Sequence, residues 1–214
     1  MNVEDMIMAI RHSIQDTIEP YQVGSEAIFN WLNEAYMRIQ LESDQWLFFK
    51  QRGVLFRTEV GQQVYEVAGV REIDSTSVYL IEDGKPRWPL FVEPYASWIN
   101  KERYTNNPLT SPYCFVIQPD GSFLIDPIPK VEFDVWCDYW IEPAPFTDGG
   151  SVPIWDEQYH DIVRLSALRI AALEWPEEKF REQLMTRVTD TLPPLLQSFR
   201  RKYLEPMRGA RALL

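Results

Sequence analysis

Histidine is the side chain that most often performs acid–base catalysis, and this chain of 214 residues contains two histidines. Either would need a nucleophile or an orienting carboxylate beside it to act as a general base. His12 lies in a helix-patterned segment without such a partner nearby in the sequence. His160 stands between Tyr159 and Asp161 at the start of another helical segment, where polar side chains are common. We therefore expect a helix-start or packing contact for His160, and we predict no catalytic residue and no enzymatic activity.

Metal and cofactor chemistry lacks its usual sequence motifs. Histidine and cysteine do not recur at the spacing of metal ligands, and the two cysteines, Cys114 and Cys137, fall in strand-like stretches. We expect both to be small buried side chains in a reducing compartment. Gly149-Gly150 is not followed by the lysine and helix of a phosphate-binding loop. We therefore predict no metal and no cofactor.

One segment, residues 131–142, alternates strictly between an apolar and a polar face, which predicts a strand. The candidate interface on the polar face consists of two tryptophans and three of the carboxylates: Trp136, Trp140, Glu132, Asp134 and Asp138. A solvated acidic face explains the carboxylates, but large aromatic side chains of this kind often meet a partner. Three interpretations of the tryptophans stay open. They are burial beneath a helix expected at 94–103 or beneath the terminal helices, a protein interface, and a carbohydrate site.

Charge is distributed unevenly along the chain, whose net charge is −11. Residues 1–44 carry 2 basic and 8 acidic side chains, a net charge of −6. From Ser198 onward the balance reverses, and five cations face only Glu205. An acidic body argues against wrapping nucleic acid, because phosphate binding depends mainly on Lys and Arg.

The C-terminal cations are interspersed with apolar side chains, which gives an extended segment something to bury. Such a segment is either a frayed terminus or one that docks into a groove on a more acidic partner. The candidate docking residues are Arg200, Arg201, Lys202, Tyr203, Met207, Arg208, Arg211, Leu213 and Leu214.

The sequence contains no run of about 18 apolar residues, so we predict no contact with a membrane. The first five residues, Met-Asn-Val-Glu-Asp, lack the basic region of a signal peptide. We therefore expect the protein to be made in a cytoplasm.

The elements that position these residues form three blocks. Residues 1–44 and 155–203 follow helical periodicity, with Ser25 as an expected N-cap, and residues 46–142 read as short strands and turns. The predicted fold class is α+β. It consists of an α-helical bundle formed by residues 1–45 and 151–203, an inserted antiparallel β-domain with one short helix at 46–150, and an extended C-terminal tail at 204–214.

Turn signals predict three hairpins within the β block. The first pairs residues 54–58 with 63–67 around Gly61, and the second returns after Gly84 into an edge strand that contains prolines. The third joins two strands around Gly121.

Several short motifs of this sequence belong together in a known family. They are Trp31-Leu32-Asn33-Glu34-Ala35-Tyr36, Asp44-Gln45-Trp46-Leu47-Phe48, Gly61 to Val67, Pro112-Tyr113, Leu124-Ile125-Asp126-Pro127-Ile128-Pro129 and Pro153 to His160. With these motifs the chain resembles the head-to-tail adaptor, or connector, proteins of tailed bacteriophages. The likeness covers most of residues 20–175, and the C-terminal tail matches by character only.

The resemblance implies a virion protein at the head-tail junction, made in the host cytoplasm. Such proteins form a homo-oligomeric ring, typically twelve-fold, under the portal protein, with a C-terminal tail that clasps the portal and a tail nozzle or tail tube protein on the opposite side. Double-stranded DNA would pass without specific binding, because an acidic channel wall repels phosphate. The carboxylates of the first two helices are candidates for that wall.

Two other functions compete with this one. A carbohydrate-binding or depolymerising tail component would use Trp136 and Trp140 with the neighbouring acids. A DNA-packaging accessory protein would show salt-sensitive DNA binding, which the acidic body disfavours.

Overall fold

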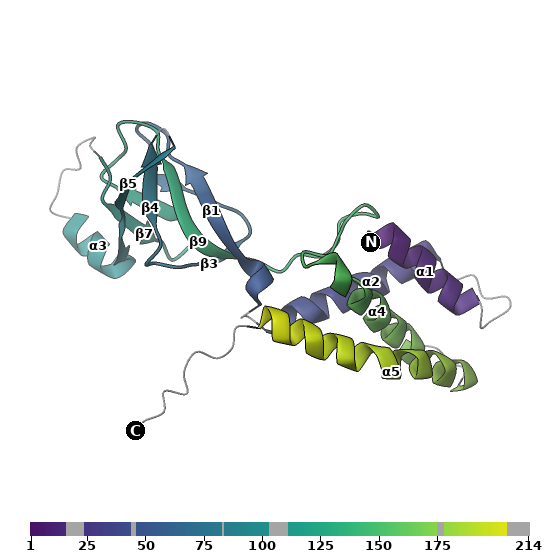
Figure 1. Ribbon diagram of the computed structural model, residues 1–214. Coiled ribbons are helices and arrows are strands. Elements are labelled where there is room, and N and C mark those ends of the chain that lie inside the picture. The colour runs from purple at the N-terminus through teal and green to yellow at the C-terminus, as the bar shows by residue number, and fades with distance from the viewer. Residues whose placement is uncertain (16–23, 44–45, 83, 103–110, 175–177, 205–214) are drawn as a thin grey trace, which may run out of the picture. The chain divides into compact units, whose positions relative to one another are not determined.

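The structure is a computed structural model that describes residues 1–15, 24–43, 46–82, 84–102, 111–174 and 178–204 (Figure 1). The chain is α+β, with helices and largely antiparallel sheets, and it divides into two compact units. The helical unit comprises Met1–Phe48 and Pro143–Leu214, and the β unit comprises Phe49–Glu142. These boundaries enclose a shorter insert than the expected 46–150.

The insert is shorter because the segments at both of its expected ends pack with the helical unit. Trp46 and Phe48 pack with aromatic side chains of the helical unit, since the Trp46 ring centroid lies 5.0 Å from that of Phe199. The stretch after Pro143 is tied to the same unit, because Asn33 accepts a hydrogen bond from the backbone N–H of Phe146 at 2.7 Å. We expected both segments in the β-domain because the first is rich in aromatic residues and the second is rich in turn residues.

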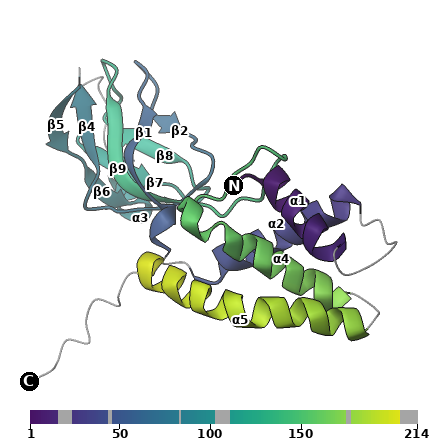
Figure 2. The ribbon, with the colours of Figure 1, turned by 45° about the vertical axis from the view of Figure 1, so that its right-hand side comes forward.

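The described part of the helical unit contains the helices α1 (Val3–Gln15), α2 (Ser25–Leu41), α4 (Asp161–Glu174) and α5 (Glu178–Tyr203), with a short 3-10 turn η2 (Glu157–Tyr159) before α4. Gly24, not Ser25, occupies the N-cap of α2, and Ser25 is the first helical residue. In α5 the helix continues through Pro193 and Pro194. In both views α1 and α5 lie on opposite sides of α2 and α4 (Figures 1 and 2).

Aromatic packing joins the end of α5 to the rest of the helical unit. The Phe199 side chain is fully buried, and its ring lies 5.0–5.9 Å from five other rings. These rings belong to Trp46, Phe48, Trp155, Tyr159 and Tyr203. Contacts of this kind bury large apolar areas.

The β unit contains two sheets. The first has the order β1-β9-β4-β5, and β3 also pairs with β9; its strands are β1 (Lys50–Arg57), β9 (Asp134–Ile141), β4 (Tyr79–Glu82), β5 (Lys85–Pro89) and β3 (Val70–Ile73). The second has the order β2-β8-β7-β6; its strands are β2 (Val64–Tyr65), β8 (Phe123–Asp126), β7 (Cys114–Ile117) and β6 (Phe91–Pro94). All pairs are antiparallel except β6 with β7, which is parallel.

Two of the three expected hairpins are confirmed. Strands β4 and β5 pair with Glu82 opposite Lys85, and β5 is an edge strand. Strands β7 and β8 pair with Ile117 opposite Phe123, across a turn in which Gly121 has a φ of 86°. The first hairpin is wrong, because β1 pairs with β9 in one sheet and β2 pairs with β8 in the other.

The chain crosses between the sheets at residues 58–63, where the first hairpin was expected. Thr58 donates its backbone N–H to the carbonyl of Phe133 at 2.8 Å, so this end stays with the first sheet. The Tyr65 hydroxyl donates to the carbonyl of Gln62 at 2.7 Å and anchors the other end. The turn at Gly61 does form, with a φ of 82°, but the strands on its two sides join different sheets, and Tyr65 is buried in the core of the β unit.

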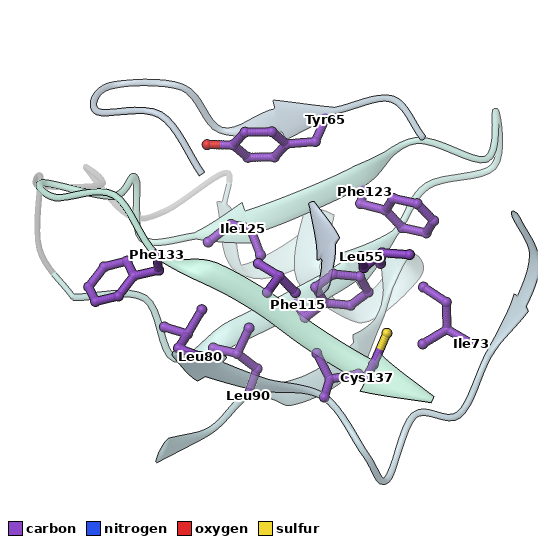
Figure 3. Packing of buried hydrophobic residues seen from close by; sticks show 12 residues of the cluster. Leu55, Tyr65, Ile73, Leu80, Leu90, Phe115, Phe123, Ile125, Phe133 and Cys137 are labelled. Carbon is purple, nitrogen blue, oxygen red and sulfur yellow. The ribbon is translucent and has the colours of Figure 1, made fainter. Parts of the chain in front are cut away.

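The core of the β unit lies between its two sheets (Figure 3). Leu55, Leu80 and Cys137 contribute from the first sheet, and Phe115 and Ile125 contribute from the second. The helix α3 (Tyr95–Glu102) covers the other face of the second sheet, where Trp98 packs with Cys114, Val116 and Leu124. Both cysteines are therefore buried, as expected.

Candidate interaction surfaces

The polar face of β9 is paired with basic side chains of β1. Register places Lys50 opposite Trp140 and Arg52 opposite Asp138. Arg52 donates from Nε and Nη2 to the two carboxylate oxygens of Asp138 at 2.7 and 2.9 Å, and Lys50 Nζ lies 3.4 Å from Asp138 Oδ2. Asp138 is only 3% exposed, so it is not part of a solvated acidic face. The hydrogen bond from Arg52, followed by that from Lys50, lowers the pKa of Asp138 below its usual value.

The two tryptophans are half-buried and engaged with neighbouring strands. The rings of Trp136 and Tyr79 lie 4.7 Å apart. The Arg52 guanidinium lies over the Trp136 ring at 5.8 Å, and Lys50 Nζ lies over the Trp140 ring at 5.0 Å. Both distances are within cation–π range. Burial beneath α3 is wrong as an explanation, because α3 packs against the second sheet.

The remaining acids of this face, Glu132 and Asp134, are more exposed. Arg57 Nη2 lies 3.1 Å from Glu132 Oε2, and Arg57 Nε lies 3.9 Å from Asp134 Oδ1. Exposed pairs of this kind contribute little to stability. The face therefore presents alternating aromatic rings and ion pairs, and its role as an interface stays a prediction.

The start of the expected docking segment is held within the helical unit. Arg200 pairs with Glu42, and Lys202 pairs with Asp156. The backbone N–H of Asp156 donates to the Tyr203 hydroxyl at 3.0 Å. The hydrogen bond from Lys202, and then that from Tyr203, lowers the pKa of the Asp156 carboxyl.

Tyr203 is buried at 8% exposure, whereas Arg201 in the same helical turn is exposed. The side chains of Arg200, Lys202 and Tyr203 are thus already used in the fold. The other docking candidates, Met207, Arg208, Arg211, Leu213 and Leu214, lie outside the described residues, and docking to a second protein stays a prediction.

His160 makes the packing contact that its position suggests. It is 3% exposed, and its Nδ1 and Nε2 each lie 2.9 Å from a backbone carbonyl oxygen, of Met1 and of Trp155. The His160 ring therefore links the backbone of Met1 to the backbone of Trp155 through hydrogen bonds at both of its nitrogens.

A groove on the helical unit was not predicted from the sequence. It has a volume of about 500 Å³ and is lined by residues of α2, α4 and α5. Leu41 and Leu173 line the groove together with Arg38 and Arg169, and the two leucines have 66% and 61% of their area exposed. The apolar residues of α4 cover more than one face of the helix, and Leu173 is exposed although most of the others are buried. The wide apolar stripe was nonetheless the signal that could have indicated this groove.

The described part of the chain lacks two kinds of feature. No group of three or more His, Cys, Asp or Glu residues there could hold a metal ion. None of its helices is long and apolar enough to cross a membrane.

The sequence also matches the model of a known protein family. The family model described as SU10 adaptor protein matches residues 1–204, which include the described elements of both units. No curated protein matches the sequence.

Proposed function

Since this chain belongs to the SU10 adaptor protein family, a family of phage head-to-tail adaptors, we propose that it joins the portal protein to the tail as a closed ring of identical subunits. The match to the family model carries this proposal. It spans residues 1–204, so it includes the helical unit on both sides of the inserted β unit. A match to only one of the two units would indicate a shared domain and would not support a shared function.

The proposed ring surrounds the DNA channel. Subunits of net charge −11 repel the phosphate backbone, so DNA passes without specific binding. Residues 1–44 carry a net charge of −6, which supports the first two helices as candidates for the channel wall.

Attachment to the portal is assigned to the C-terminal segment. The end of α5 is fixed to the helical unit through Arg200, Lys202 and Tyr203, so the segment that follows starts from a held position. Residues 205–214 contain Arg208 and Arg211 among apolar residues and suit a groove on a more acidic partner. A tail nozzle or tail tube protein would bind the opposite side of the ring.

Electron microscopy of the purified chain mixed with portal rings of the same phage tests the function. We expect a second ring stacked on the portal. A chain that ends at Leu204 should keep the helix content of the full chain by circular dichroism but fail to attach. Attachment by the truncated chain would refute the role of the tail. Failure of the full chain to attach, or salt-sensitive binding to DNA instead, would refute the function itself.

A further inference from the structure

We propose that the groove between α2, α4 and α5 receives the exposed face of α1 from a second copy of this chain. This inference rests on the proposed ring and identifies the two surfaces that neighbouring subunits use. Both surfaces belong to the helical unit.

The groove has apolar walls, and its charged lining consists of Arg38, Arg169 and Glu42. Ile39, Ile170 and Leu192 are buried at 5%, 7% and 4% exposure, and the more exposed Leu41 and Leu173 stand beside them. Leucines with more than half of their area in water beside an apolar groove are typical of an interaction surface.

Two guanidinium groups line the same groove. Arg38 pairs with Glu34 along α2 and Glu42 pairs with Arg200, whereas Arg169 has no ion-pair partner within the residues that the structure describes. The groove therefore favours a partner that offers an apolar side chain next to carboxylates.

The exposed face of α1 has that chemistry. Met8 is 50% exposed, and the exposed carboxylates of Glu4 and Asp5 lie on the same face, four and three residues before it. The helix start is also held in place, because Val3 and Glu4 donate backbone hydrogen bonds to the carbonyls of Ser151 and Gly149 at 3.0 and 2.9 Å. A face that is already ordered loses little conformational entropy on binding.

The arrangement of the two surfaces suits a ring. α1 packs against α2 and α4, while α5 packs against α4, and α1 and α5 lie on opposite sides of α2 and α4 (Figures 1 and 2). A ring of more than two copies requires two different complementary surfaces on each subunit. Each subunit can then offer α1 to one neighbour and its groove to the other.

Disulfide trapping between two variants of the full chain tests the contact. We expect mild oxidation of Met8→Cys mixed with Leu173→Cys to give a two-chain product on a non-reducing gel, with far less product from either variant alone. The native cysteines stay silent because Cys114 and Cys137 are 1% and 0% exposed. Absence of the mixed product, or equal product from a single variant, would overturn the inference.

A second pair of variants gives an independent measurement. Leu173→Asp should abolish ring assembly on the portal, whereas Val60→Asp, at 60% exposure in the β unit, should assemble as the unchanged chain does. Circular dichroism checks that both variants fold. Rings that form with Leu173→Asp would refute the contact and leave the adaptor function intact. A mixed disulfide without portal attachment would instead refute the adaptor function and leave the contact intact.

Discussion

Asp138→Asn is expected to destabilise the β unit through the loss of one partly buried ion pair. The side chain of Asp138 is buried, and its carboxylate accepts two hydrogen bonds from Arg52, at 2.7 and 2.9 Å. A hydrogen bond to a charged group contributes about 1.5–3 kcal/mol to stability. The Arg52 side chain is 69% exposed, so water competes for it and reduces the gain. We therefore expect a loss of about 1–2 kcal/mol in the free energy of unfolding at neutral pH.

Asp134→Asn is the matched control, because it makes the same change on the same strand and face. Asp134 is 36% exposed and lies 3.9 Å from Arg57, so its substitution should cost about 0.5 kcal/mol or less. Urea denaturation followed by circular dichroism and tryptophan fluorescence measures both losses. Equal losses for the two variants would refute the argument from burial.

The difference between wild type and Asp138→Asn should also depend on pH. The pKa of Asp138 is lowered in the folded protein, so its stabilisation is fully present above the unfolded value of about 3.9. That stabilisation is lost as the pH falls through the lowered pKa of the folded state. A difference that stays constant from pH 7 to pH 3 would contradict the assignment of the ion pair.

Three further results are expected. Phe199→Ala should lower the free energy of unfolding by about 3–5 kcal/mol, because it empties a fully buried site among five aromatic rings; a wild-type midpoint in urea would contradict this. Gly121→Ala should lower the free energy of unfolding by about 1–2 kcal/mol, because Gly121 has a φ of 86°, which a residue with a Cβ adopts only with strain. Gly53→Ala, at a position without positive φ, should lower it by less, and thermal unfolding measures both. A thiol reagent should label Cys137 only after unfolding, because burial raises its pKa to about 12; rapid labelling of the native chain would exclude this burial.

Local pattern was enough to predict many elements of this fold. The alternation of residues 131–142 corresponds to β9, and the glycine turns at Gly84 and Gly121 correspond to the two confirmed hairpins. The segment expected as a short helix at 94–103 contains α3. These features depend on neighbours in the sequence, which a single chain displays directly.

Partners that are distant in the sequence could not be predicted in the same way. Strand β1 pairs with β9 instead of with the nearer β2, and this pairing brings Lys50 and Arg52 to Trp140 and Asp138. Without that register the β9 face was interpreted as acidic, although cations cover it. The groove at Leu173 likewise depends on three helices that meet only in the folded unit.

The helical unit is interrupted in the sequence by the whole of the β unit, from Phe49 to Glu142. During synthesis α1 and α2 leave the ribosome before the β unit, but α4, against which both of them pack, follows only after the strands of that unit. The buried stripe of α2, including Ile28, Leu32 and Ile39, must therefore wait for its partners while the insert is made. The strands of the β unit have all been synthesised by then. The β unit can therefore fold first, and the helical unit completes its packing afterwards.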